Sequence, residues 1–238
     1  MRIGLASIPY IKREKFFIDL KDTWNNYKLI DKGFGNVFID KLEENILQKE
    51  IDDLYNELCK YNSIKENVVF STSPIDIIAR LIWAVSENYI SHDFFNKNLK
   101  TLNKMFKHLD CIFYLPISKF NELNPPDSIS AAEFYDENFL DKLNQNLNDL
   151  YLAYSIRMQN PFFDVEDCPA IIEVYGTDEE KIQMVKMFLD EKGVLKEPQV
   201  VLPEAESELI QNLTEQLDKD LEDIQNEKMK KLKEDSNK

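Results

Sequence analysis

Short apolar runs alternate with longer amphipathic stretches from Met1 to about Gly193. The apolar runs resemble strands of a parallel sheet that are buried on both faces, and they begin near Arg2, Tyr27, Val68, Cys111 and Ala170. Helical periods separate these runs. Strands that alternate with helices form strand–helix–strand units, so the pattern predicts an α/β fold, a three-layer sandwich around a mostly parallel sheet.

Capping residues and prolines along the chain predict where the helices begin and end. Ser73-Pro74 supplies a cap and a first-turn proline, and Thr177 to Glu180 has the pattern of a capping box. The expected helices cover residues 12–27, 38–61, 94–108 and 136–158. Two further helices are expected, one that begins at Ser73-Pro74 and one that begins at the capping box and ends near Leu189. The segment 119–135, which contains Pro125-Pro126-Asp127, is expected to be a loop or lid.

The composition changes after Gly193 and predicts three parts: a domain over 1–194, a linker over 195–203, and a charged C-terminal helix and tail over 204–238. Apolar residues recur in the last part at spacings of 3, 4, 4 and 3, namely Ile210, Leu213, Leu217, Leu221 and Ile224. This stripe is the candidate protein-binding surface. It is typical of a helix that docks on its own domain, on a second copy or on a partner protein.

The charge balance excludes some classes of partner. Forty-four acidic residues against 29 basic ones give a net charge of −15, so neither nucleic acid nor an anionic membrane is expected as a partner. A local basic patch is compatible with this total. No apolar run approaches the ~20 residues that a membrane-spanning helix needs, and the apolar start at Ile3 is too short for a signal peptide.

The residue types that usually carry chemistry give weak signals. Three cysteines without C-x-x-C spacing predict neither a zinc site nor a disulfide framework, which favours a reducing, cytoplasmic setting. His92 and His108 have no sequence neighbours at the spacing of metal ligands or catalytic triads, and both are interpreted as ordinary residues. No metal site is therefore expected.

The first strand–helix turn is where an α/β fold of this kind usually holds a phosphate group. Residues Ser7 to Glu14 match the spacing of the P-loop pattern G-x-x-x-x-G-K-[ST], but all four of its key residues are replaced. The replacements are Ser7, Lys12, Arg13 and Glu14.

Several segments nevertheless resemble one family when they are taken in order. They are Met-Arg-Ile-Gly-Leu at the start, Asp19-Leu20 and Trp24-x-x-Tyr27, Val68-Val69-Phe70 with Ser73-Pro74-Ile75-Asp76, Leu109 to Ile117, and Pro169 to Gly176 followed by Glu179-Glu180-Lys181. From Met1 to about Gly193 the chain resembles the small P-loop kinase-like ATPases of phage genomes, which are related to the ribosylnicotinamide kinase domain of NadR and more distantly to thymidylate kinases. The resemblance implies five parallel strands in the order 2-3-1-4-5.

The departures from this family concern the residues that handle phosphate. The resemblance implies a metal-binding hydroxyl at Glu14, where a carboxylate about 4 Å from a phosphate oxygen would cost roughly 4 kcal/mol at an effective dielectric of 20. It implies an Asp-Arg pair where Ser71-Thr72 stands, and a lid arginine where residues 119–135 contain none. The family's machinery for phosphoryl transfer is thus altered in three places.

These departures predict a catalytically inactive kinase-like module, with no catalytic residue and no cofactor, that is phage-encoded and serves as a binding or structural component. A protein partner or self-association through the C-terminal helix is expected, in the host cytoplasm or a virion. Lys12 and Arg13 are candidate remnants of a phosphate site or an ordinary charged helical turn; Asp76 is a candidate substrate ligand or a first-turn carboxylate. The alternative is an active nucleoside or nucleotide kinase that uses ATP and Mg²⁺ with a non-standard P-loop.

Overall fold

The computed structural model describes most of the chain up to Lys196. The described residues are 1–8, 11, 13–31, 43–62, 66–117, 137–158, 162–164 and 168–196. The chain divides into two compact units, Met1–Leu195 and Lys196–Lys238. The described residues do not include Lys12 or the segment 119–135. They also do not include the C-terminal helix expected from residue 204, with its five apolar positions.

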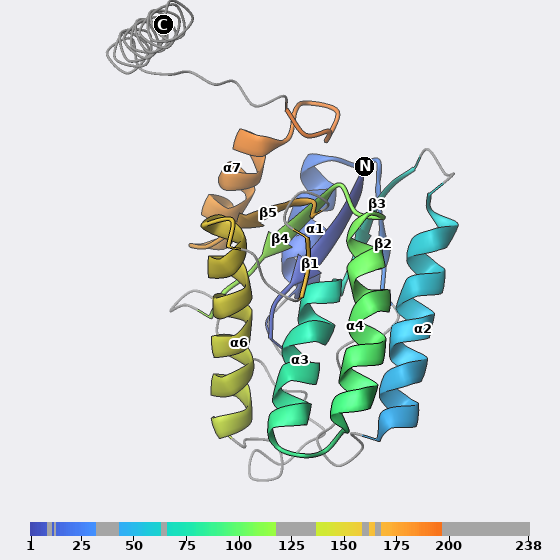
Figure 1. The fold of residues 1–238 in the computed structure, drawn as a ribbon. Helices are drawn as coiled ribbons and strands as arrows, with labels where there is room; N and C mark the ends of the chain where they lie inside the picture. Colours follow the sequence, from blue (N-terminus) through green and yellow to red (C-terminus); the bar gives the residue numbers. More distant parts are fainter. Residues whose placement is uncertain are drawn as a thin grey trace, which may run out of the picture. The chain divides into compact units, whose positions relative to one another are not determined.

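Five parallel strands form the centre of the first unit (Figure 1). They are β1 (Arg2–Ala6), β2 (Tyr27–Ile30), β3 (Asn67–Phe70), β4 (Cys111–Tyr114) and β5 (Ala170–Glu173). Their order is β2-β3-β1-β4-β5, and all four pairings are parallel. Both the strand positions and the order 2-3-1-4-5 expected from the sequence are therefore confirmed. The central strand β1 is buried from Ile3 to Ala6, as a continuous apolar run predicts.

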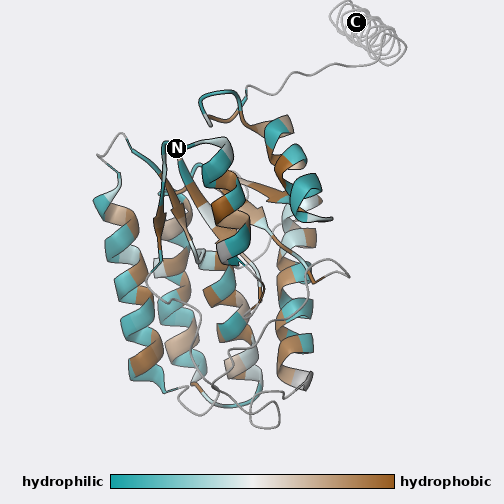
Figure 2. Ribbon diagram, turned by 180° about the vertical axis from the view of Figure 1, so that it is seen from behind, coloured by the Kyte–Doolittle hydropathy of each residue, from teal (hydrophilic) through white to brown (hydrophobic). Residues whose placement is uncertain are grey.

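Helices cover both faces of this sheet, as the sandwich prediction requires. They are α1 (Arg13–Thr23), α2 (Glu44–Lys60), α3 (Pro74–Ser86), α4 (His92–Phe106), α6 (Glu137–Ser155) and α7 (Asp178–Phe188). In Figure 1, α2, α4, α3 and α6 form one layer in front of the sheet, and the view from behind in Figure 2 shows α1 on the opposite face. Figure 2 also shows hydrophilic and hydrophobic residues alternating along the helices, which is the arrangement that amphipathic periodicity predicts.

Some helix ends differ from the expected ones. The first helix ends at Thr23 rather than at residue 27, because Asn25 and Asn26 form a turn and Tyr27 already pairs with Asn67 in the sheet. The helix expected to start at Phe94 begins at His92, since the Ser91 side chain accepts a hydrogen bond from the Phe94 N–H and caps it.

The chain between α7 and residue 195 returns to the start of β2. The Trp24 indole donates to the Asp190 carbonyl at 2.9 Å, the Asn26 amide donates to the Lys192 carbonyl at 3.1 Å, and Leu189 pairs with Leu195 in an antiparallel bridge. Gly193 has a φ of +73°, and a Cβ there would lie 2.7 Å from the Tyr27 ring. These contacts fasten the end of the first unit to its sheet.

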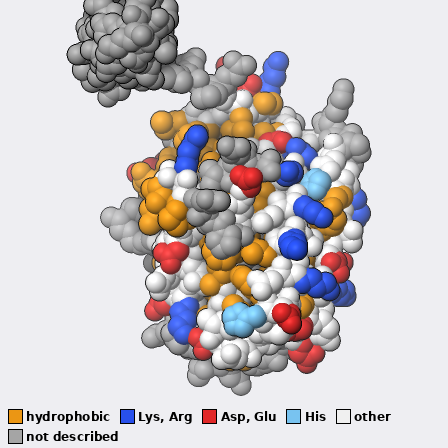
Figure 3. Space-filling view, viewed as in Figure 1, with side chains coloured by type: hydrophobic (Ala, Val, Ile, Leu, Met, Phe, Trp, Pro, Cys, Tyr) orange, Lys and Arg blue, Asp and Glu red, His pale blue; other side chains and the backbone are white. Residues whose placement is uncertain are grey.

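The outer face of α4 carries a basic stripe although the chain as a whole is acidic. Lys97, Lys100 and Lys104 of α4 and Lys107 directly after it are exposed and follow one another at spacings of 3, 4 and 3. Figure 3 shows basic side chains gathered over this helix. The stripe forms because the opposite side of α4 packs against α2 and α3. The negative net charge of the chain thus coexists with a local excess of positive charge along α4.

Candidate functional site

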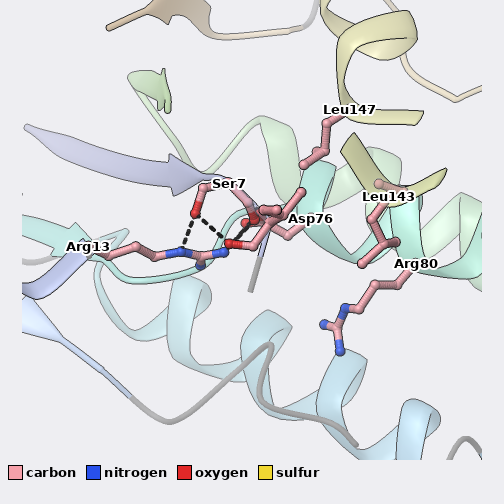
Figure 4. A pocket seen from close by; sticks show the side chains of 8 residues that line it. Ser7, Arg13, Asp76, Arg80, Leu143 and Leu147 are labelled. Atoms are coloured by element: carbon pink, nitrogen blue, oxygen red, sulfur yellow. Dashed lines mark hydrogen bonds and ion pairs between the residues drawn. The ribbon is translucent and has the colours of Figure 1, made fainter. Parts of the chain in front are cut away.

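The candidate site lies where the carboxyl ends of β1 and β3 meet the beginnings of α1 and α3 (Figure 4). Gly4 lets these elements come close together, because a Cβ at this position would lie 3.1 Å from the Cβ of Ser73 and 3.0 Å from Leu109. The first residue of α1 is Arg13, and the residue that precedes α3 is Ser73. Two helix beginnings therefore converge on the end of the central strand.

Arg13 turns its guanidinium inward at this place. Its Nε donates to the Ser7 hydroxyl at 2.5 Å, its Nη1 donates to the Ser71 carbonyl and to the Thr72 hydroxyl, and its Nη2 donates to the Ser7 carbonyl. Nη2 also lies 3.4 Å from the Asp76 carboxylate. All three guanidinium nitrogens thus have acceptors within the protein. The side chain is 15% exposed, and burial lowers the pKa of Arg13 while Asp76 opposes this shift.

Asp76 is the buried partner of this arginine. Its Oδ1 accepts a hydrogen bond from the Ser7 N–H at 2.8 Å, and its Oδ2 accepts from the Ser73 N–H at 2.8 Å and from the Ser73 hydroxyl at 3.2 Å. Burial raises the pKa of Asp76, whereas Arg13 and the two backbone donors act in the opposite direction. Each carboxylate oxygen is therefore engaged, and Asp76 connects the end of β1 to the start of α3.

A second buried ion pair lies one turn farther along α3. The Arg80 guanidinium donates two parallel hydrogen bonds to the Glu50 carboxylate of α2, at 3.0 and 2.5 Å. Both side chains are less than one-tenth exposed, and Glu50 raises the pKa of Arg80 against the effect of burial. The sequence analysis missed this pair. The only signal for it was a charge within the apolar stripe of each helix, next to Ile51 and Leu81.

The space among these residues is small. A pocket has Ser7, Arg13, Asp76 and Arg80 on its polar side and Leu143 and Leu147 of α6 on its apolar side (Figure 4). Its cavity volume of about 10 Å³ is close to the lower limit for one water molecule. The Nε of Arg80, a residue that lines this pocket, is buried and has no hydrogen-bond partner.

Neutral hydroxyls occupy the position after β3. The Ser71 hydroxyl donates to the Asp31 carboxylate at 2.9 Å, and Asp31 follows directly after β2. The Thr72 hydroxyl accepts from Arg13 at 3.4 Å. Asp31 is a further residue that the sequence analysis did not single out, although its place after a strand could have indicated it.

The structure brings together two of the candidate residues proposed from sequence, Arg13 and Asp76, and places both in one buried network. Lys12 lies outside the described residues. Within the described part of the chain, no three His, Cys, Asp or Glu side chains form a group that could hold a metal ion, and no helix there is long and apolar enough to cross a membrane.

The structure gives His108 two polar neighbours that its sequence spacing did not indicate. Its two ring nitrogens face Cys59 and Asn62, which are distant in sequence. Packing of α4 against α2 creates this proximity, so sequence spacing could not reveal it.

Comparison with known proteins gives likenesses at the level of structure. No protein-family model and no curated protein sequence matches the chain. Deoxyadenosine kinase from M. mycoides with bound dATP is similar, with a TM-score of 0.53, 12% identity, and coverage of 79% of this chain and 98% of that one. The same enzyme with the products dCMP and dCDP gives a TM-score of 0.55 at 12% identity, covering 79% and 97%.

The NadR protein in complex with NAD and AMP-PNP is also similar, with a TM-score of 0.51 and 13% identity. The match covers 82% of this chain and 50% of the NadR chain. At such identities the likeness extends to the arrangement of helices and strands alone. Together with the strand order 2-3-1-4-5, it shows that the chain has the P-loop kinase fold.

Proposed function

We propose that this chain is a catalytically inactive member of the P-loop kinase fold that serves as a binding or structural component. The observation that carries the proposal is the inward orientation of Arg13. Its guanidinium is satisfied by Ser7, Ser71, Thr72 and Asp76, where a phosphate-binding cation would have to face outward.

Moving Arg13 toward a nucleotide would break its buried contact with Asp76. Removing one partner from a buried charged pair typically costs about 3–5 kcal/mol, because the other charge loses its compensation. The free energy gained by binding a phosphate group would have to exceed this cost before any net affinity resulted. The arrangement therefore disfavours phosphate binding by Arg13.

Neither of the two residues after β3, where the family resemblance implies an Asp-Arg pair, carries a carboxyl group. Ser71 and Thr72 carry neutral hydroxyls, which do not act as bases near neutral pH without an activating partner. The Ser71 hydroxyl donates to the carboxylate of Asp31, which follows β2 and not β3. This chemistry supports the loss of phosphoryl transfer.

The binding role rests on the C-terminal region. We propose that Ile210, Leu213, Leu217, Leu221 and Ile224 form the surface that contacts a protein partner or a second copy. Burying each of these side chains is worth roughly 1.5–3 kcal/mol, so a helix bearing the stripe needs a partner surface. We further propose a phage origin, with the protein acting in the host cytoplasm or in a virion without nucleic-acid, membrane or cofactor binding.

Nucleotide titration tests the proposal. Isothermal titration of the full chain with ATP and Mg²⁺ is expected to give no saturable heat, and ATP turnover is expected to stay at background. Arg13→Ala and the matched Lys15→Ala, whose cation lies on the exposed side of α1, serve as paired variants. Turnover in the wild type that is lost in Arg13→Ala and kept in Lys15→Ala would instead establish the alternative, an active nucleoside or nucleotide kinase.

A further inference from the structure

A cluster of polar side chains lies at the edge of the sheet opposite the Arg13 network. Tyr55 and Cys59 belong to the last turns of α2, Asn62 follows this helix, and His108 follows α4. Both helices end at the amino ends of strands, since α2 leads to β3 and α4 leads to β4. Figure 1 shows these helix ends on the same side as the N-terminus. The cluster is therefore separate from the site described above.

The hydrogen bonds around His108 define which ring nitrogen carries the proton. The Asn62 Oδ1 accepts a hydrogen bond from the Arg2 Nη1 at 2.8 Å, which fixes the orientation of the amide. The His108 Nδ1 lies 2.8 Å from the same oxygen and must donate to it. In the neutral ring the proton is thus on Nδ1, and Nε2 is free to accept.

This accepting nitrogen faces a thiol. The His108 Nε2 lies 3.8 Å from the Cys59 Sγ, within the range of hydrogen bonds that involve sulfur. Burial lowers the pKa of His108, and the nearby charge of Arg2 lowers it further. The imidazole is therefore neutral at neutral pH, and its Nε2 can accept a hydrogen bond from the Cys59 thiol. Arg2 itself is held in place by Asp110 at 2.6 Å.

Tyr55 supplies a second contact to the sulfur from one turn earlier on α2. The neighbouring Cys59 raises the pKa of Tyr55 electrostatically, and a hydrogen bond between the two side chains raises it further. The phenol consequently remains a donor. A hydroxyl that donates to a thiolate stabilises it, as does an imidazolium formed beside it.

The two other cysteines provide an internal comparison. Cys111 is buried in β4, and burial raises the pKa of its thiol well above the ordinary value. Burial also raises the pKa of Cys168 to about 12. Cys59 and Cys168 are both half-buried, so a small reagent can reach either, and exposure does not distinguish these two thiols.

We propose that Cys59 is an activated thiol, with His108 as its base and Asn62 as the residue that positions His108, and that it is the site where this chain reacts with soft carbon electrophiles. The thiol proton moves from Sγ to the His108 Nε2. The thiolate then attacks carbon, the S–C bond forms, and the leaving group departs with the electron pair of the broken bond. The imidazolium afterwards releases its proton to water.

Site-resolved alkylation tests this proposal on the full chain. Iodoacetamide serves as the probe, iodide is the leaving group, and mass spectrometry follows carbamidomethylation of each cysteine with time. Cys59 is expected to react at least about tenfold faster than Cys168. A positioned base typically accelerates a reaction by ~10²–10⁴-fold, so the expected factor is a conservative one. The chain unfolded in guanidinium gives the intrinsic rate of each thiol.

Paired histidine variants separate the base from its surroundings. His108→Gln is expected to slow alkylation of Cys59 about tenfold and leave Cys168 unchanged, whereas His92→Gln, which alters an exposed histidine at the start of α4, changes neither rate. Tyr55→Phe is expected to slow Cys59 by a smaller factor. Circular dichroism checks that each variant is folded. Equal Cys59 rates in the wild type and a folded His108→Gln, or a slower Cys59 in the folded than in the unfolded wild type, would overturn the proposal.

Discussion

The guanidinium of Arg13 and the carboxylate of Asp76 lie 3.4 Å apart, although 63 positions separate them along the chain. The first residue of α1 is Arg13, and Asp76 lies in the first turn of α3. Their contact places a compensated pair of charges at the end of the central strand. A site in which a cation and an anion already neutralise each other has little net field with which to attract a phosphate.

The coupling between these two residues can be measured by a double-mutant cycle. Arg13→Met and Asp76→Ala are each expected to lower the free energy of unfolding by about 3–5 kcal/mol, because each leaves the other charge buried without its partner. The double variant is expected to lose less than the sum of the two single losses. Urea denaturation measures all three. Strict additivity would show that the two residues do not stabilise each other, and Lys15→Met, on the exposed side of α1, is the surface control.

Restoring the P-loop residues alone is not expected to restore catalysis. The variant carries Ser7→Gly, Lys12→Gly, Arg13→Lys and Glu14→Thr, and it removes the guanidinium that bonds inward at position 13. It still has Ser71 and Thr72 after β3, and it has no arginine in the segment 119–135. Phosphoryl transfer depends on several such groups together, each worth orders of magnitude in rate. ATP turnover should therefore remain at background in a coupled assay. Turnover well above the wild type would contradict this expectation.

The pH dependence of stability is expected to report on Glu44. Its carboxylate accepts hydrogen bonds from the N–H and the hydroxyl of Ser91, both at 2.7 Å, and these bonds lower its pKa, the N–H having the larger effect. For an acid whose pKa is lowered by folding, the stabilisation is present above the ordinary value of 4.5 and is lost as the pH falls through the folded-state pKa.

The corresponding variant is Glu44→Gln. Its urea midpoint should lie below that of the wild type at neutral pH, and the two midpoints should converge as the medium becomes more acidic than the lowered pKa of Glu44. Glu66→Gln, which alters an exposed glutamate just before β3, should follow the wild type throughout. A constant difference between Glu44→Gln and the wild type at every pH would refute the charged hydrogen bonds as its cause.

Deleting the residues after Leu202 tests the attachment role of the C-terminal region. The shortened chain is expected to keep the fold of the unit Met1–Leu195, because the contacts of Trp24 and Asn26 with Asp190 and Lys192 that close this unit remain. Self-association is expected to be lost because the apolar stripe is removed. Analytical ultracentrifugation measures the oligomeric state and circular dichroism measures folding. Loss of folding would show that the C-terminal region belongs to the core.

Local patterns in the sequence were sufficient to predict the elements of the fold. Buried strands such as β1 and β4 are continuous apolar runs, and the caps at Ser73 and Thr177 mark helix starts, because these signals depend on neighbouring residues only. The strand order came from the resemblance of ordered motifs to a known family. Arg13 and Asp76 could be selected for the same reason, since each occupies a recognisable position in such a motif.

Tertiary structure alone decided what these side chains do. The inward turn of Arg13 depends on carbonyl groups of Ser7 and Ser71 that meet only when β1 and β3 pair. The contact of Cys59 with His108 spans 49 positions, and that of Arg80 with Glu50 spans 30. Neither follows from periodicity, which places a residue on a face of its own helix. Which residue of a second helix then lies opposite is set by how the two helices pack.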